Sequence, residues 1–468
     1  MKDTVFRKYD IRGKVGSDLD IQRMYDLGRA LAYYFKERNP LIRTVAIGMD
    51  GRNHSLAIRQ EISKAFMDSG LDVSFIGVCP SPALYFAMFT RPFDAGIMVT
   101  ASHNPKEYNG LKLCLGKEML WGEEVQKIKC YFKEGKKIES NRVGKYDESP
   151  IIEPYIDFLK DHFKHLIGMK LSAIVDCGNG AGGTVLPLLI EKMGWKNVTV
   201  LFEEVDGNYP NHEADPVVAE NMSFVKQALK TVDAEVGIGL DGDADRMAAM
   251  TKEGQLISGD VLLAIYAEPL LKANPGSSIV FDIKASQGLA ELVEQWGGKL
   301  IMSPSGHSII KKNMDENDSV LAGELSCHFF FSDRYFGFDD ALYAMMRLFE
   351  IMVASKQSLS QLVSVFPQKI SSPEMRIKCS DKNKHHVIED AKSLFIARDD
   401  VTVITIDGVR AIMDYGWGIL RVSNTQPVLS LRIESDTQEG FKKVKEDFYK
   451  VLEPHFDQAF LKREFDDI

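Results

Sequence analysis

The chain has 468 residues and a net charge of -10, with 45% hydrophobic and 26% charged side chains. This length predicts two to four domains, and the acidic balance disfavours a nucleic acid as partner. No run reaches the ~18 apolar residues of a membrane span, and the six cysteines form no CxxC pair, so we expect a cytoplasmic protein with free thiols and no membrane partner.

Three blocks of the chain repeat one order of predicted elements, strand–helix–strand–helix–strand. In the first block these lie at 45–50, 56–70, 73–76, 83–89 and 96–100. In the second they lie at 173–176, 184–193, 198–202, 222–229 and 236–241. In the third they lie at 279–282, 288–296, 300–302, 308–314 and 320–324. Such alternation is typical of parallel α/β units.

Each block opens with a strand that ends in aspartate (Asp50, Asp176 and Asp282) and closes with an apolar strand that leads into a polar loop. These loops read TASHNP (100–105), DGDADR (241–246) and GELSCH (323–328). Ligands of parallel α/β sheets lie beyond the carboxyl ends of the strands. We therefore predict that all three loops carry chemistry.

The pattern changes after a proline-punctuated stretch at 366–373. Residues 401–434 predict a small antiparallel sheet with glycine turns, and residues 437–452 predict an amphipathic helix. The predicted fold class is therefore α/β: three similar mixed α/β domains around a cleft, followed by a C-terminal α+β domain with an antiparallel sheet. The predicted domain boundaries are 1–150, 151–252, 253–366 and 367–468.

Three carboxylates alternate along the second loop, at Asp241, Asp243 and Asp245. Oxygen ligands this close repel one another unless a cation lies between them. An EF-hand is excluded, because its sixth and twelfth positions would be Arg246 and Lys252 instead of glycine and glutamate. The loop predicts a Mg²⁺ site with positions left for water or phosphate, and Arg246 would hold an anion beside it. The alternative is a solvated acidic turn.

A serine and a histidine are adjacent in the first loop, at Ser102 and His103. The G-x-S-x-G pattern of a serine hydrolase is absent, and a lone Ser-His pair in a loop is usually turn chemistry. The position of Ser102 at a strand end, opposite the predicted metal loop, favours a nucleophile.

The loop at 178–183 contains the pattern G-x-G-x-x-G, and Glu203 and Glu204 follow the next predicted strand. This spacing resembles a dinucleotide-binding fingerprint and makes a nicotinamide-dependent dehydrogenase the alternative enzyme. Asp176 shortly precedes the first glycine, and a carboxylate there would repel a pyrophosphate. We therefore favour a tight strand-to-helix turn.

Two further loops carry groups suited to polar ligands. The segment RVSNTQP (421–427) offers a guanidinium, hydroxyls, an amide and backbone N–H groups, which suit a phosphate dianion. The segment GELSCH offers a carboxylate, a hydroxyl and an imidazole, which suit a sugar. Taken alone, the first is better explained as a turn with a surface arginine, and the second is a weak signal.

Taken together and in this order, the motifs FRKYDIRG, TASHNP, DGDADR, GELSCH and RVSNTQP resemble those of the α-D-phosphohexomutase superfamily, above all its bacterial phosphomannomutase/phosphoglucomutase branch. The resemblance spans residues 6–434 and continues into the last helix. It implies reversible phosphoryl transfer between O1 and O6 of mannose and glucose phosphates, through phosphoserine 102 and a 1,6-bisphosphate intermediate. Such catalysis depends on positioning and charge stabilisation.

The resemblance also implies roles for individual residues. Asp241, Asp243 and Asp245 would bind Mg²⁺ together with the phosphoryl group on Ser102. The implied catalytic set, with Lys112 and the histidines as proton-transfer candidates, is Ser102, His103, Lys112, Arg12 and His307. The implied substrate-binding set is Tyr9, Arg246, Lys284, Glu324, Ser326, His328, Arg421, Ser423, Asn424 and Thr425. In that set, sugar hydroxyls would contact Glu324, Ser326 and His328, and the non-reacting phosphate would contact Arg421, Ser423, Asn424 and Thr425.

The implied partners are hexose phosphates, with glucose 1,6-bisphosphate or mannose 1,6-bisphosphate as activator and intermediate, and the protein would be a monomer or a small homo-oligomer.

Two positions depart from the family pattern, since Cys327 stands where glycine is usual and Ala244 where glycine is common. The preference between mannose and glucose stays open, because Glu324 suits either epimer. The alternatives are a superfamily mutase for another phosphosugar, the dehydrogenase, and a phosphosugar-binding protein without turnover.

Overall fold

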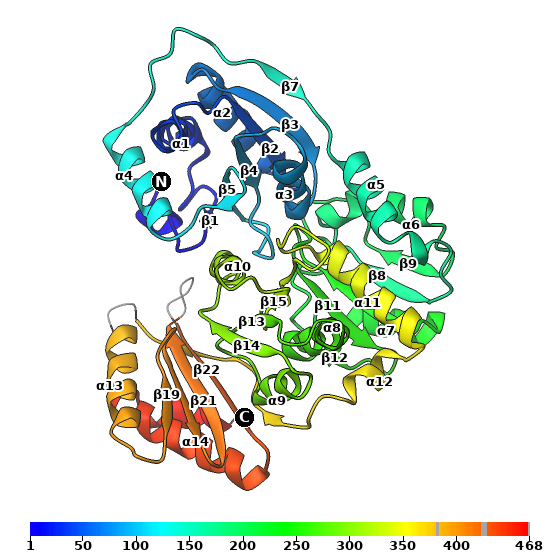
Figure 1. Cartoon of the computed structure of the whole chain (residues 1–468). Helices are drawn as coiled ribbons and strands as arrows, with labels where there is room; N and C mark the ends of the chain where they lie inside the picture. Colours follow the sequence, from blue (N-terminus) through cyan, green and yellow to red (C-terminus); the bar gives the residue numbers. More distant parts are fainter. Residues whose placement is uncertain (381–382, 423–427, 467–468) are drawn as a thin grey trace.

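The computed structural model describes residues 1–380, 383–422 and 428–466. Its strands form four sheets, which follow one another along the chain (Figure 1). The predicted fold class is confirmed: three mixed α/β sheets are followed by an antiparallel one. In the described residues, no helix combines the length and hydrophobicity needed to cross a bilayer.

The first sheet has the strand order β1-β5-β4-β2-β3-β7, with β6 beside β5. Its strands are β1 (Ile11–Lys14), β2 (Thr44–Met49), β3 (Asp72–Val78), β4 (Ala95–Val99), β5 (Tyr108–Leu115), β6 (Glu118–Met119) and β7 (Tyr146–Glu148). The helices of this part are α1 (Met24–Arg38), α2 (Ser55–Asp68), α3 (Ser81–Thr90) and α4 (Glu123–Glu134).

The second sheet has the order β12-β11-β10-β8-β9 and the third the order β14-β13-β15-β16. Their strands are β8 (Ala173–Asp176), β9 (Val198–Leu201), β10 (Val236–Leu240), β11 (Met247–Thr251), β12 (Leu256–Ile257), β13 (Ser278–Asp282), β14 (Lys299–Ser303), β15 (Leu321–Gly323) and β16 (Phe329–Phe331). The accompanying helices are α5 (Ile152–His162), α6 (Leu186–Met193), α7 (Ser223–Val232), α8 (Gly259–Ala273), α9 (Gln287–Gln295), α10 (His307–Glu316), α11 (Ala341–Ser355) and α12 (Leu359–Val363).

The three blocks share one topology. The opening strands β2, β8 and β13 each lie between two parallel neighbours, which are the middle and the closing strand of the same block. The closing strands β4, β10 and β15 then pair antiparallel with the strand that follows. This returning strand was not predicted, and it makes each polar loop the connection of an antiparallel pair. The predicted helix at 184–193 begins later, at Leu186, where Pro187 occupies the first turn.

The aspartates that end the opening strands form the same turn in all three blocks. Each carboxylate is buried and accepts a hydrogen bond from the backbone N–H two residues later. The distances are 3.0 Å from Arg52 to Asp50, 2.7 Å from Gly178 to Asp176, and 3.2 Å from Lys284 to Asp282. The sequence repeat is therefore a repeated turn at the carboxyl end of a strand.

Helix α3 joins the first block to the next two. Its residues from Ser81 to Met88 are all buried, and the Phe86 ring lies 5.5 Å from Tyr155 of α5 and 6.2 Å from Phe336. A single hydrophobic cluster extends from α3 through the second and third sheets, while the first sheet has a second cluster with α1, α2 and α4. Apolar burial therefore fixes the first block against the others.

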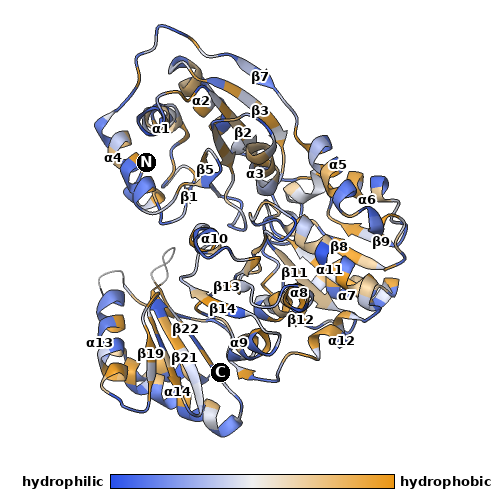
Figure 2. Ribbon diagram, in the orientation of Figure 1, coloured by the Kyte–Doolittle hydropathy of each residue, from blue (hydrophilic) through white to orange (hydrophobic). Residues whose placement is uncertain are grey.

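The C-terminal sheet has the order β17-β22-β21-β20-β19, with β18 also beside β22. Its strands are β17 (Ile370–Ser371), β18 (Met375–Lys378), β19 (Thr402–Ile404), β20 (Val409–Met413), β21 (Gly416–Val422) and β22 (Val428–Ser435), and its helices are α13 (Lys384–Ile396), α14 (Gln438–Leu452) and α15 (Gln458–Asp466). Hydrophobic residues run along β21 and β22 (Figure 2), and this sheet has its own core with the three helices.

Candidate active site

Ser102 lies in the loop between β4 and β5 and is 3% exposed. Its Oγ donates a hydrogen bond to Asp241 Oδ2 at 2.8 Å and lies 3.1 Å from His103 Nδ1. Its backbone is left-handed, with a φ of 50°, a conformation that costs free energy for residues other than glycine. Strain of this kind is concentrated at functional sites.

The three carboxylates of the second loop are almost fully buried. Lys112 Nζ lies 2.6 Å from Asp243 Oδ2 and also pairs with Asp245. Burial and the two neighbouring carboxylates raise the pKa of Asp241 to about 7. Burial opposes ionisation of Asp243 as well, but the Lys112 ammonium outweighs it and holds the pKa of Asp243 well below its usual range.

A cation fits this loop, because Lys112 and Arg246 together leave two oxygens of the three buried carboxylates without a hydrogen-bond partner among the described residues. Within the part of the chain that the structure describes, the Oδ1 atoms of Asp243 and Asp245 are buried without a hydrogen-bond partner. Ligand atoms of all three aspartates lie within 4.8 Å of one another. Hard oxygen donors in this arrangement suit Mg²⁺.

The third loop joins the second through a backbone bridge between Arg246 and His328. His328 Nδ1 lies 2.9 Å from Asp339 Oδ2 and 3.7 Å from Asp245 Oδ1. Burial opposes protonation of His328, but the carboxylates of Asp245 and Asp339 outweigh it and raise its pKa to about 9. Glu324 lies on the other side of the imidazole, with Oε2 4.0 Å from His328 Nε2.

A second histidine faces the first. The rings of His307 and His328 are stacked with centroids 5.5 Å apart, and burial lowers the pKa of His307 to about 4. Burial and the guanidinium groups of Arg246 and Arg12 likewise hold the pKa of His103 well below its usual range. The pKa values of the three imidazoles are thus shifted in opposite directions within one site.

The remaining predicted cations form two groups. Near Ser102, Arg12 donates to Asn104 Oδ1 at 2.7 Å, and Arg246 pairs with Asp241 at 3.0 Å. On the C-terminal side, Arg421 pairs with Asp407 at 2.8 Å, and Lys284 pairs with Glu374 at 3.3 Å.

The segment at 305–307 contacts the first block through Tyr9, the third loop through Glu324 and the C-terminal domain through Asp407. Tyr9 Oη donates to the carbonyl of Ser305, the N–H of Ser305 donates to Asp407 at 3.1 Å, and the N–H of Gly306 donates to Glu324 at 2.6 Å. Ser326 lies half-buried in the third loop. Ser423, Asn424 and Thr425 lie outside the described residues. The other predicted site residues thus lie around one connected region.

Several polar residues of this region were missed in the sequence analysis. Each contacts a predicted site residue, and they are Arg52, Ser81, Asp215, Asp339, Glu374 and Asp407. The repeat itself carried a signal for Arg52, because it stands two residues after Asp50 just as Lys284 stands two residues after Asp282. The others belong to no repeated motif.

The two residues that stand where the family has glycine, Cys327 and Ala244, both have a left-handed backbone conformation. Cys327 has a φ of 69° and Ala244 a φ of 52°, and both side chains are buried. The left-handed conformation costs an L-residue roughly 1–2 kcal/mol. The loops therefore keep the conformation that glycine adopts freely.

The glycines at 178–183 allow neighbouring backbone segments to approach closely. A Cβ on Gly180 would lie 2.7 Å from the carbonyl oxygen of Gly242, and one on Gly183 would lie 1.9 Å from that of Glu203. The Asp176 carboxylate accepts the N–H of Gly178 and contacts His212 Nε2 at 3.0 Å. This contact geometry supports the turn that we favoured over a dinucleotide site.

The pair of His212 and Asp176 predicts a pH dependence of stability. Burial opposes protonation of His212, but Asp176 outweighs it and raises the pKa of His212. The pair therefore stabilises the fold below the unfolded pKa of about 6.5, and this contribution is lost as the pH rises through the raised pKa. In urea denaturation, His212→Gln should lower the free energy of unfolding more near pH 6 than near pH 9.

A matched control is His386→Gln, since His386 is exposed and its ring lies 3.4 Å from Asp390. An exposed pair of this kind contributes little, so this variant should behave like the wild type at both pH values. An equal loss for His212→Gln at both pH values would contradict the prediction.

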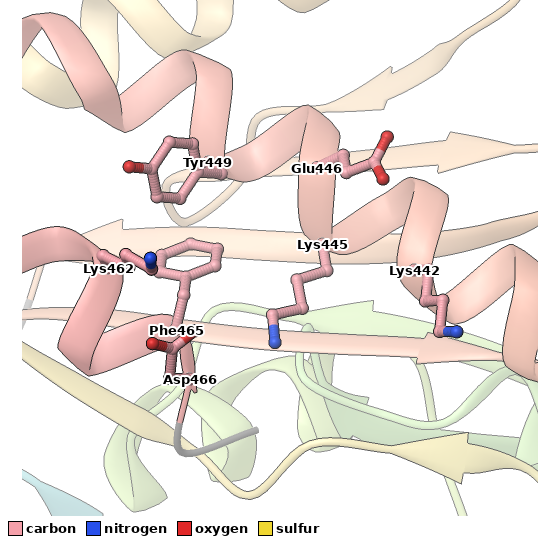
Figure 3. A pocket seen from close by; sticks show the side chains of 7 residues that line it. All are labelled: Lys442, Lys445, Glu446, Tyr449, Lys462, Phe465 and Asp466. Carbon is pink, nitrogen blue, oxygen red and sulfur yellow. The ribbon is translucent and has the colours of Figure 1, made fainter. Parts of the chain in front are cut away.

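A cavity of about 270 Å³ lies between α14 and α15 (Figure 3). It is lined by Lys442, Lys445, Glu446, Tyr449, Lys462, Phe465 and Asp466. It contains none of the predicted site residues, and charges of both signs surround it. This cavity is therefore separate from the candidate site.

Family models cover most of the chain. Models described as phosphoglucomutase/phosphomannomutase alpha/beta/alpha domains I, II and III match residues 3–139, 153–254 and 258–370. The model of the C-terminal domain of the same family matches residues 374–451. The chain belongs to the phosphoglucomutase/phosphomannomutase family.

Individual relatives are similar over nearly the whole length. A phosphomannomutase/phosphoglucomutase of Pseudomonas putida is 39% identical over 97% of this chain and 96% of that protein. A phosphoglucomutase of Neisseria gonorrhoeae is 39% identical over 96% of this chain and 97% of that protein. The crystal structure of a phosphoglucomutase/phosphomannomutase family protein from Burkholderia thailandensis superposes with a TM-score of 0.88 at 33% identity, covering 97% of this chain and 98% of that one.

Proposed function

We propose that this phosphohexomutase depends on Mg²⁺ and interconverts the 1- and 6-phosphates of mannose and glucose. The observation that carries this proposal is the contact of Ser102 Oγ with Asp241 Oδ2, at 2.8 Å, within a loop of three buried aspartates. A phosphoryl group on Ser102 would thus lie beside the donors for its counter-ion. The names of the relatives support hexose phosphates as substrates.

The proposed reaction conserves the phosphoryl group. The bond between phosphorus and Ser102 Oγ breaks as a bond forms to the free hydroxyl of the hexose phosphate. The hydroxyl gives up its proton to a base, and Ser102 Oγ takes up a proton; the return step reverses both transfers. The resulting 1,6-bisphosphate, of glucose or of mannose, reorients and returns its other phosphoryl group to Ser102. Mg²⁺ held by Asp241, Asp243 and Asp245 would neutralise charge on the transferred group.

The surrounding residues divide these tasks. For proton transfer we propose His103, which lies 3.1 Å from Ser102 Oγ, together with His307 and Lys112. Glu324, Ser326 and His328 would contact sugar hydroxyls. Arg12 and Arg246 would stabilise the transferred group, and Tyr9 and Lys284 would bind the substrate. The fixed phosphate would contact Arg421, Ser423, Asn424 and Thr425. Because the sugar must bind in two opposite orientations, the residues that contact its hydroxyls and those that contact its fixed phosphate are both required.

We also propose the domain boundaries 1–150, 151–252, 253–366 and 367–468, with the strand pair of β12 and β11 extending the second sheet slightly beyond residue 252. A cytoplasmic location is supported by buried thiols at Cys79, Cys114 and Cys177. We retain the proposal of a monomer or small homo-oligomer.

The test is ³¹P NMR of the protein with Mg²⁺ and a trace of glucose 1,6-bisphosphate, given mannose 1-phosphate and glucose 1-phosphate in separate tubes. A 6-phosphate signal should grow in both tubes, and the two rates rank the sugars. Silence in both would contradict the proposal and favour another phosphosugar or a binding protein without turnover.

A further inference from the structure

Arg52 is a buried arginine that organises the loop of Ser102. It stands in the turn after β2, is 3% exposed, and pairs through Nε with Asp50 Oδ2 at 3.1 Å. Its two terminal nitrogens donate hydrogen bonds to four backbone carbonyls, three in this loop and one in the first residue of β5. The acceptors are the carbonyls of Ser102 at 2.6 Å, Asn104 at 2.5 Å, Pro105 at 2.8 Å and Tyr108 at 3.1 Å.

The same arginine contacts the second block. Its guanidinium carbon lies 5.1 Å from the centre of the Tyr209 ring. The neighbouring segments are in close contact, because a Cβ on Gly51 would lie 2.0 Å from the side-chain atom Cγ1 of Val205, and one on Gly207 would lie 2.6 Å from the backbone nitrogen of Asn53. Arg52 is thus held between the Ser102 loop and the second block.

The Ser102 loop is confined from its other side by the metal loop. A Cβ on Gly242 would lie 2.5 Å from the carbonyl oxygen of Ser102, which is the atom that accepts from Arg52. Ser102 keeps its left-handed backbone between these two neighbours. A small displacement of that carbonyl would move Oγ relative to Asp241.

We propose that Arg52 is a positioning residue that fixes Ser102 Oγ against the aspartates of the metal loop. Four carbonyls and a carboxylate require the forked donors of a guanidinium, which an ammonium cannot replace. The turn itself does not require arginine, since Lys284 occupies the same place in the third block and directs its ammonium to Glu374. This inference rests on the proposed function, in which Ser102 carries the phosphoryl group.

The decisive variant is Arg52→Lys, which keeps the positive charge beside Asp50 and removes the several N–H donors of the guanidinium. We expect kcat to fall about 100-fold, because a displacement of Ser102 Oγ by about 1 Å has an effect of this size. KM for the hexose phosphate should be unchanged. Phosphorylation of Ser102 by glucose 1,6-bisphosphate should slow by the same factor. Circular dichroism and the melting temperature report whether the variant is folded.

The matched control is Arg91→Lys. Arg91 also donates to backbone carbonyls, those of Ser149 at 2.7 Å and Pro150 at 2.9 Å, but it does not contact the Ser102 loop. We expect this variant to keep the wild-type kcat even if its melting temperature falls. An equal fall of kcat in both variants would overturn the proposal.

A second variant keeps the proposal testable if Arg52→Lys does not fold. Tyr209→Leu removes the ring that packs on the guanidinium and leaves its hydrogen bonds, so kcat should fall less, again with KM unchanged. Wild-type kcat in this variant, or in folded Arg52→Lys, would overturn the positioning role alone. Absence of turnover in the wild type would instead refute the proposed function.

Discussion

Ser102→Ala is expected to lower kcat by about 10³-fold or more, because it removes the oxygen that we propose to carry the phosphoryl group. The side chain contributes little to packing, so the fold should be retained. The variant should also fail to take up a phosphoryl group from labelled glucose 1,6-bisphosphate. Steady-state kinetics with glucose 1-phosphate and the labelling experiment measure these two effects.

Ser69→Ala is the control for this prediction. Ser69 is a buried serine of the same block, and its hydroxyl donates to the carbonyl of Ala65 at 2.8 Å. Its replacement should leave kcat and labelling unchanged. Comparable turnover in Ser102→Ala and Ser69→Ala would refute the nucleophile assignment.

Asp243→Asn is expected to raise the half-saturating Mg²⁺ concentration by at least about tenfold, since even indirect partners of a metal contribute this much. The amide keeps the shape of the side chain but lowers the negative charge of the loop. It also removes the ion pair with Lys112, at 2.6 Å. Titration of kcat with Mg²⁺ measures the shift.

The matched control is Asp340→Asn. Asp340 is equally buried, but its carboxylate accepts hydrogen bonds from Tyr155 and Tyr335, each at 2.7 Å, and it lies outside the metal loop. This variant should lose stability and keep the wild-type Mg²⁺ response. An unchanged Mg²⁺ response in Asp243→Asn would contradict its assignment as a ligand.

The repeated elements of the fold were predictable because each block alternates apolar strands with amphipathic helices. The antiparallel returning strands were not predicted, since the segments at 108–115 and 247–251 follow directly after polar loops and carry no separate turn signal. Helix α3 was predicted, but its burial on all sides was not, because its contact surface belongs to α5 and Phe336, far along the chain.

The loops of the candidate site were predictable as motifs, and the structure brings their described residues into one region. The residues that support them were harder to predict. The repeat marks the position of Arg52, but the carbonyl oxygens that Arg52 contacts cannot be predicted from the sequence. Asp339 contacts His328 only after β16 has returned along β15. Partners of this kind depend on tertiary structure, which local spacing does not encode.

Mass spectrometry of the peptide that contains Ser102 is the most direct test of the central claim, that the phosphoryl group passes through this residue. The account predicts a labelled phosphopeptide after incubation with labelled glucose 1,6-bisphosphate and Mg²⁺, and transfer of that label to the hexose phosphates, with Ser102 still phosphorylated, when excess unlabelled hexose 1-phosphate is added. Turnover of hexose phosphates without phosphorylation of Ser102 at any stage would contradict the account.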